Sequence, residues 1–171
     1  PASFAATKGW GAQWHTLRND TLPSDFPTFQ IQVFDNPAPG TIFMCPFLRG
    51  TPRHTYLTIL DENITPLYYS RRPESMNDFK LQPNGLITFF DTRTRCFYAM
   101  NSSYVIIDSF RCANGYVTDG HDFQMLANGH AFLMSYDTRV VDMSVIVPGG
   151  NPAATVSGVV IQELDGNKQL V

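Results

Sequence analysis

The chain has 171 residues, of which 43% are hydrophobic, 13% aromatic and 16% charged, and its net charge at pH 7 is -3. This is the composition of an ordinary globular protein, and the lack of a basic excess argues against a nucleic-acid partner. No apolar run approaches the roughly 20 residues of a membrane-spanning helix, and the first residues lack the profile of a signal peptide. We therefore expect an intracellular protein or one whose leader has been removed.

The three cysteines, Cys45, Cys96 and Cys112, are widely spaced and odd in number. They exclude a dense disulfide framework and a four-cysteine metal site. At most one bridge is expected, and the sequence does not say which pair would form it.

Predicted elements begin after a lead-in over residues 1–30, which shows neither the strand period nor the helix period clearly. Residues 31–34 alternate between apolar and polar side chains and predict a strand. The Pro- and Gly-rich stretch 36–40 would end it, because proline removes a ladder donor and glycine permits positive φ. Residues 41–48 predict a second strand.

From residue 56 onward the strand pattern is sharper. Residues 56–60 and 67–69 flank a polar turn and predict a hairpin. Further strands are predicted at residues 96–100, 104–110, 159–164 and 169–171. No stretch of a dozen residues carries the 3.6-residue apolar period, so the sequence predicts an all-β fold.

One stretch of the chain occurs twice. Residues 78–90 return about 45 residues later as residues 122–136, with the same order of polar strand, Asn-Gly turn and apolar strand. A repeat of about 40–50 residues made of short strands and tight turns is typical of a β-propeller blade. Asn77 precedes the first copy, whereas His121 precedes the second. Only the second copy therefore carries a group suited to catalysis at this position.

The motif Asp-Gly-His-Asp-Phe at 119–123, followed by Asn-Gly-His at 128–130, resembles the bacterial arylsulfotransferase (arylsulfate sulfotransferase) family. Four segments carry the resemblance: 104–108, 114–116, 118–123 and 160–165. It implies a six-bladed β-propeller, often preceded by a small β-domain, that is secreted or periplasmic. The resemblance also implies transfer of a sulfuryl group from a phenolic sulfate ester to a phenol acceptor. In that family no cofactor donates the sulfate, and a histidine near the propeller axis carries it covalently.

The chain is too short to close such a ring. Residues 56–171 would hold two to three blades, at about 45 residues each, whereas closed propellers typically have about four to eight. Residues 1–55 would be a lead-in or the end of an N-terminal β region. We expect either a fragment of a longer catalytic propeller, inactive by itself, or a homo-oligomer or complemented chain that covers the open strand edges.

His121 is the candidate catalytic residue. Alternation along a regular strand would place Asp119, His121 and Phe123 on one side, which makes Asp119 the expected helper of the histidine. Gly120 would let a ligand or another backbone approach closely. A neutral imidazole is a competent nucleophile near neutral pH, so His121 could attack sulfur or hold its oxygens. If the chain begins at the family's first blades, the resemblance implies that His121 binds substrate and that the nucleophile lies elsewhere.

Structural roles compete with these functional ones. His121 could satisfy backbone groups at a junction between sheets, as buried polar groups usually do. Asp78 in the first copy and Asp122 in the second occupy the same position of the repeat. An Asp in both copies favours a turn or an inter-strand hydrogen bond over catalysis. Arg72, next to Arg71, could attract a sulfate and is the second candidate substrate-binding residue, although paired surface arginines usually serve solubility.

A metal site is not expected. Adjacent residues on opposite faces of a strand cannot all converge on one ion, which argues against zinc. The residues considered for it are Asp119, His121, Asp122 and His130.

Two other functions are compatible with the repeat. The first is a non-catalytic propeller that binds a carbohydrate, a protein or its own copies. The second, a quinone-dependent dehydrogenase propeller, is disfavoured because tryptophan-docking repeats are absent and both tryptophans, Trp10 and Trp14, lie outside the repeated region.

Overall fold

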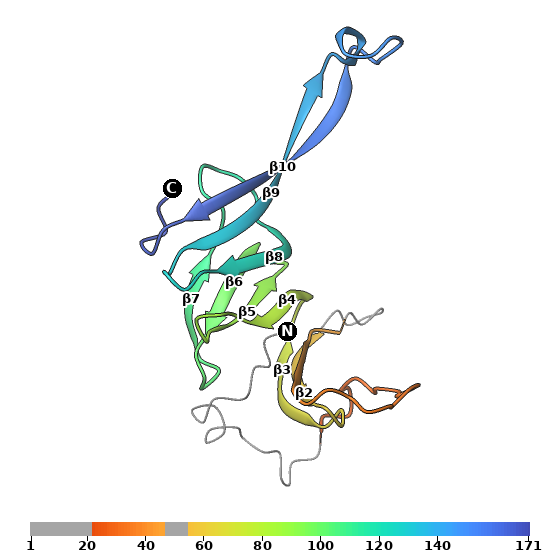
Figure 1. Cartoon of the computed structure of the whole chain (residues 1–171), viewed down its shortest axis with the longest axis vertical. Helices are drawn as coiled ribbons and strands as arrows, with labels where there is room; N and C mark the ends of the chain where they lie inside the picture. Colours follow the sequence, from red (N-terminus) through yellow and green to blue (C-terminus); the bar gives the residue numbers. More distant parts are fainter. Residues whose placement is uncertain (1–21, 47–54) are drawn as a thin grey trace.

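The structure is a computed structural model that describes residues 22–46 and 55–171. Within these ranges the fold is all-β, as predicted, and ten strands form three antiparallel sheets (Figure 1). The first sheet contains β1 (Thr41–Met44), β2 (Thr55–Asp61) and β3 (Pro66–Arg72). The second contains β4 (Met76–Leu81), β5 (Ile87–Asp91), β6 (Cys96–Met100) and β7 (Ile106–Phe110). The third contains β8 (Asp119–Met125), β9 (Ala131–Val141) and β10 (Ala154–Leu164).

Most of the predicted strands from residue 56 onward are confirmed. The hairpin β2–β3, the pair β6–β7 and the C-terminal half of β10 lie where the alternation places them. The prediction for residues 169–171 holds only as an isolated bridge between Leu164 and Leu170. The prediction for 41–48 corresponds to β1 as far as Met44, and residues 47–54 lie outside the described ranges.

The strand predicted at residues 31–34 is wrong, because this segment has no regular secondary structure. Val33 is 82% exposed and Phe34 is 55% exposed, so no neighbouring sheet covers the apolar side chains of this segment. An alternating sequence becomes a strand only when another strand pairs with it and a core covers one of its faces. The segment has neither.

Both copies of the repeat fold into the same hairpin. The amide of Gly85 donates to the carbonyl of Gln82, and that of Gly129 donates to the carbonyl of Leu126. The two glycines have φ of 83° and 85°, the left-handed region that glycine adopts without steric cost. The Asn-Gly turns therefore fix β4–β5 and β8–β9 as equivalent pairs.

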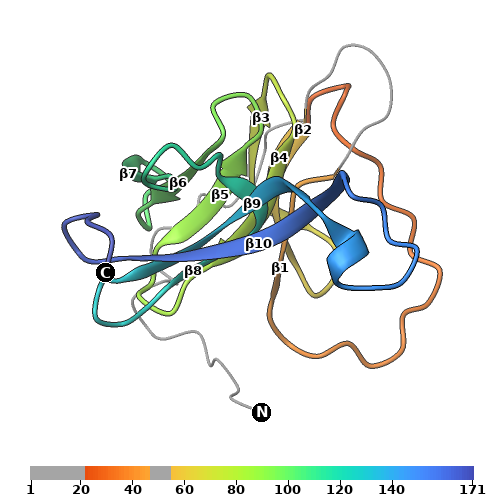
Figure 2. The same ribbon diagram turned by 90° about the horizontal axis from the view of Figure 1, so that it is seen from above.

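The second sheet lies between the other two. Its first strand, β4, packs against β1 on one side and β8 on the other, so the first strands of the three sheets are neighbours. Figure 2 shows β8, β9 and β10 crossing over the strands of the second sheet. Phe89 and Phe90, adjacent on β5, point to opposite faces and join different cores. Phe89 packs toward the first sheet and Phe90 toward the third.

Two apolar clusters hold the sheets together. Between the first and second sheets lie Leu57, Ile59, Met76, Phe79, Ile87, Phe89 and Met100. Between the second and third lie Phe90, Phe97, Ala99, Phe110, Cys112, Phe123, Met125, Ala131, Leu133 and Leu164. The segment before β1 covers the outer face of the first sheet, where the Phe26 ring contacts Tyr56 and Tyr69 at centroid distances of 5.1 and 5.5 Å.

Beyond β8, the strands β9 and β10 continue as a two-stranded arm, defined here as residues 135–160. The register is unbroken from the Ala131–Leu164 pair to the Val141–Ala154 pair. A short 3-10 helix, η1 (Met143–Val145), lies in the loop at its tip, and Figure 1 shows the arm extending away from the three sheets. No ring closes within the described residues, and a propeller stays a prediction.

Candidate functional site

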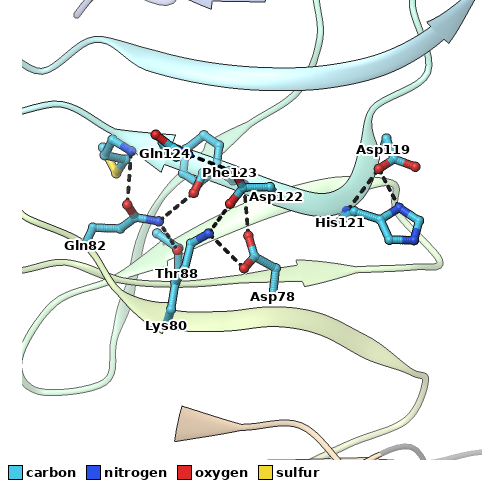
Figure 3. Close-up of polar contacts among 10 residues, drawn as sticks. Asp78, Lys80, Gln82, Thr88, Asp119, His121, Asp122, Phe123 and Gln124 are labelled. Carbon is cyan, nitrogen blue, oxygen red and sulfur yellow. Dashed lines mark hydrogen bonds and ion pairs between the residues drawn. The ribbon is translucent and has the colours of Figure 1, made fainter. Parts of the chain in front are cut away.

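Asp119 and His121 form a dyad at the start of β8, in contact as the sequence predicts. Oδ1 of Asp119 lies 2.7 Å from Nδ1 of His121 and also accepts the backbone amide of His121 at 3.0 Å. The carboxylate is nearly buried, whereas the histidine side chain is 76% exposed. Figure 3 shows the ring beside Asp119, away from the polar network centred on Lys80. The arrangement is local, because residue 119 closes a turn on residue 121.

The predicted alternation of β8 does not hold around the dyad. Asp119 pairs with Met134 and Phe123 with Leu133, so three residues of β8 are inserted within one step of β9. This bulge re-aims the side chains: Asp119 and Phe123 are buried and His121 is exposed. Bulges commonly terminate pairing or redirect a side chain in this way. The dyad survives because its hydrogen bonds do not depend on strand alternation.

Gly120 fits the bulge against the second sheet. A Cβ at this position would lie 2.2 to 2.7 Å from three ring atoms of Phe90. The sequence predicted close approach of a ligand or another backbone at Gly120, whereas the neighbour is an aromatic side chain of the core. Contact between β8 and Phe90 fixes the backbone that carries both dyad residues.

A second polar group joins β4 to β8. Nζ of Lys80 lies 2.8 Å from Oδ1 of Asp78 and 2.5 Å from Oδ1 of Asp122. Oδ2 of Asp78 accepts the backbone amide of Phe123 at 2.9 Å. Asp78 thus bonds to another strand, as the structural interpretation of the repeated Asp predicts. Lys80 was not singled out from the sequence.

The pKa values of Asp78 and Asp122 shift in opposite directions. Burial raises the pKa of Asp78 above its usual value of 3.8, although hydrogen bonding to Lys80 opposes the rise. Burial also opposes ionisation of Asp122, but hydrogen bonds from Lys80 and Gln124 outweigh it and lower its pKa. For Lys80, burial lowers the pKa, yet hydrogen bonds to Asp122 and Asp78 dominate and raise it. The lysine is therefore held charged between the two acids.

Gln82 forms the buried part of the same junction. Its amide nitrogen donates to the Thr88 hydroxyl at 2.7 Å and to the Phe123 carbonyl at 3.0 Å. Its amide oxygen accepts the Met125 amide at 3.0 Å. One side chain thus pairs two backbone groups of β8 that would otherwise be buried without partners.

Arg72 does not join the dyad. Its guanidinium lies over the ring of Phe89, 4.6 Å from the centroid, on the side of the second sheet that faces β3. His121 belongs to the third sheet, across the second sheet from Arg72. The contact with Phe89 is a cation–π interaction between sheets.

The sequence gives only a partial indication that Lys80 and Gln82 are important. Asp78 and Asp122 are repeated, but Lys80 is replaced by Gln124 and Gln82 by Leu126 in the second copy. Where two successive copies of the repeat meet, the two sides of the contact need different residues. A comparison of the two copies therefore does not reveal Lys80 or Gln82. Their importance follows only from the packing of β4 against β8.

Other features of the described residues give no metal site. Among residues 22–46 and 55–171, no three His, Cys, Asp or Glu side chains are placed to hold a metal ion. The second described histidine, His130, bonds through Nδ1 to Oε1 of Glu163 at 2.7 Å. Cys45, Cys96 and Cys112 are all unbridged. No helix in the described part of the chain has the length and apolar character needed to cross a membrane.

Comparison with known proteins gives no relative: no protein-family model, curated protein or solved structure matches the chain.

Proposed function

We propose that the chain is part of a β-propeller resembling the bacterial arylsulfotransferases, in an exported protein, and that His121 handles the sulfuryl group. The transfer would run from a phenolic sulfate ester to a phenol. The observation that carries the proposal is the 2.7 Å contact of Asp119 with Nδ1 on an otherwise exposed imidazole. A carboxylate that accepts a hydrogen bond from Nδ1–H keeps the proton of the neutral ring on Nδ1. The lone pair is then on Nε2, at the outer edge of the ring.

The arrangement of the sheets supports the propeller. The second sheet has its strands in sequence order, β4-β5-β6-β7, as in a propeller blade. The first strands of successive sheets, β1, β4 and β8, are neighbours, as strands around a shared axis would be. The dyad lies on one of these first strands, where an axial site would be built.

The chemistry of the proposed transfer balances without a cofactor. The Nε2 lone pair of His121 attacks sulfur, an N–S bond forms, and the S–O bond to the donor breaks as phenolate leaves. The acceptor phenol then attacks sulfur, the N–S bond breaks, and the phenol proton passes to a base in solvent. Asp119 orients the ring and stabilises the positive charge that forms on it. If a histidine from another part of a longer chain is the nucleophile, His121 binds the sulfuryl oxygens instead, and its imidazolium form donates from Nε2 while Nδ1 donates to Asp119.

A second candidate is a non-catalytic module that binds a ligand or assembles with other chains. The surroundings of His121 favour it. Within the described residues, Asp119 is the only side chain in hydrogen-bond or ion-pair contact with the imidazole. Sulfuryl transfer normally needs several donors for the spread negative charge.

Experiments with 4-nitrophenyl sulfate distinguish the two proposed functions. Binding to the chain is measured by calorimetry, nitrophenolate release is measured by absorbance with phenol as acceptor, and mass spectrometry detects a covalent sulfuryl adduct. We expect binding that His121→Ala weakens by roughly tenfold or more, with His130→Ala as the matched control that retains it. Release or an adduct that depends on His121 supports catalysis. Binding without either shows that His121 of this chain binds the sulfate ester without carrying the sulfuryl group, and absence of binding rejects the arylsulfate function.

A further inference from the structure

The chain contains three Asn-Gly pairs, at residues 84–85, 114–115 and 128–129. Two of them form the equivalent turns of the repeated hairpins, and the third lies in the connection between β7 and β8. In an Asn-Gly pair the glycine nitrogen can reach the side-chain carbonyl carbon of the asparagine, because glycine has no side chain in the way. The three pairs differ in how the fold holds these two groups.

The pairs in the hairpins are held by hydrogen bonds at both groups. The amide of Gly85 donates to the Gln82 carbonyl at 2.9 Å, and Oδ1 of Asn84 accepts the amide of Leu86 at 3.1 Å. The second copy makes the same two bonds within residues 126–130, at 3.0 and 3.1 Å. Before the glycine nitrogen can attack, its own bond must break and the asparagine side chain must turn away from its partner.

The pair Asn114-Gly115 makes neither bond. Both residues are exposed and have positive φ, 56° and 77°, in a tight turn closed by the Tyr116 amide on the Ala113 carbonyl at 3.2 Å. Among the described residues, none is hydrogen-bonded to the Gly115 amide or to the Asn114 carboxamide. These two groups can therefore rotate toward each other without a bond being lost.

The residues on both sides of this turn are fixed. Gln162 on β10 accepts the Ala113 amide at 2.7 Å and donates to the Ala113 carbonyl at 3.2 Å. The Thr118 hydroxyl accepts the Cys112 amide at 2.8 Å. The reactive pair is thus confined to one exposed turn, five residues before Asp119, while the structure around it stays folded.

We propose that the fold singles out Asn114 as a site of deamidation and isomerisation. The Gly115 nitrogen, after losing its proton to a base in solvent, attacks Cγ of Asn114. An N–Cγ bond forms, the Cγ–Nδ2 bond breaks, and ammonia leaves with a proton from water. The product is a cyclic imide, and this step needs no cofactor or enzyme.

Water then opens the imide at one of its two carbonyls. Opening at Cγ breaks the new N–Cγ bond and leaves aspartate at position 114. Opening at the backbone carbonyl breaks the original peptide bond and leaves isoaspartate, in which the main chain passes through the side-chain carbons. Either product adds one negative charge to the net charge of -3. This modification is independent of the role of His121.

The proposal is tested by incubating the folded 171-residue chain at mildly alkaline pH and sequencing its proteolytic peptides by mass spectrometry over time. Deamidation exchanges an NH2 group for an OH group, and the gain in mass locates the site. We expect Asn114 to react roughly tenfold or more faster than Asn84 and Asn128, because each hairpin turn must first give up its hydrogen bonds. Circular dichroism confirms that the chain stays folded during the incubation.

The same chain in concentrated urea is the control for the fold. There the hairpin turns are lost, so the three pairs should react at similar rates. Asn114→Gln should remove the acidic species that ion exchange separates from the fresh chain, because glutamine closes the corresponding ring far more slowly, and the matched Asn84→Gln should retain it. Equal rates at the three sites in the folded chain would overturn the proposal. An advantage of Asn114 that persists in urea would overturn it too, since the local sequence would then set the rate.

Discussion

The two copies of the repeat use an irregular first strand in different ways. In β4 the register shifts between Asn77 and Lys80, and Asp78 takes a left-handed φ of 47°, which turns its carboxylate onto β8. In β8 the shift is larger and exposes His121 while Asp119 closes the turn. The hairpins that follow are the same. The repeat thus supplies a common scaffold, and the bulge decides whether a copy presents a sheet-joining carboxylate or a reactive side chain.

The largest effect is expected when the hydrogen bonds from Gln82 on β4 to β8 are removed. Gln82→Leu leaves the Phe123 carbonyl and the Met125 amide without their hydrogen bonds, so we expect a loss of about 3 kcal/mol in the free energy of unfolding. Urea denaturation measures it. Gln124→Leu, an exposed glutamine in the equivalent strand, should change stability by less than about 0.5 kcal/mol. Equal effects of the two variants would show that Gln82 does not hold the sheets together.

The β8 bulge can be tested through its contact with the second sheet. Gly120→Ala would press a methyl group into the Phe90 ring, and overpacking of this kind costs about 1–3 kcal/mol. Thermal unfolding should show the loss, and Phe90→Leu in the same chain should restore part of it. Gly166→Ala, where a Cβ meets open space, is the neutral control. No recovery in the double variant would mean that the strain lies elsewhere.

Lys80→Met sharpens the comparison of the two aspartates. At neutral pH it leaves Asp78 buried without its cation, and we expect a loss of about 1–2 kcal/mol, reduced by solvent screening of Asp122.

The pH dependence should also change sign. In the native chain the lowered pKa of Asp122 contributes stability above its usual value of 3.8, and this is lost as pH falls through the lowered value. The raised pKa of Lys80 contributes stability below 10.5 that is lost as pH rises through the raised value. The raised pKa of Asp78 already acts in the opposite direction in the native chain. In the variant, which lacks the opposing hydrogen bond from Lys80, acidification through this raised pKa should restore stability, because the buried carboxyl becomes neutral. Urea unfolding of Lys80→Met that weakens steadily on acidification would contradict this account.

The smallest effect is expected at the dyad. Asp119→Ala removes an acceptor from a largely exposed ring, so the stability should change by about 1 kcal/mol or less. The tautomer of His121 should change more clearly, from the Nδ1-protonated form toward the Nε2-protonated form. Nitrogen-15 chemical shifts of the imidazole report this, with His130 as the internal reference. An unchanged tautomer would show that Asp119 does not orient the ring.

Several parts of the fold were predictable because they depend on neighbouring residues. The Asn-Gly turns at Gly85 and Gly129 require positive φ, and the flanking apolar runs then pair as strands. The contact of Asp119 with His121 was also predictable, since the two residues are separated by only one position. The strand predicted at 31–34 failed for the opposite reason: alternation gives no strand without a partner.

The sequence by itself determined the all-β class, the repeated hairpins and the pairing of Asp119 with His121. Only the tertiary structure decided that Lys80 and Gln82 join β4 to β8, that Gly120 rests on Phe90 and that Arg72 lies across the second sheet from His121. The physical reason is distance along the chain. Turns and alternation are settled within a few residues, whereas these contacts join residues that only the stacking of the sheets brings together.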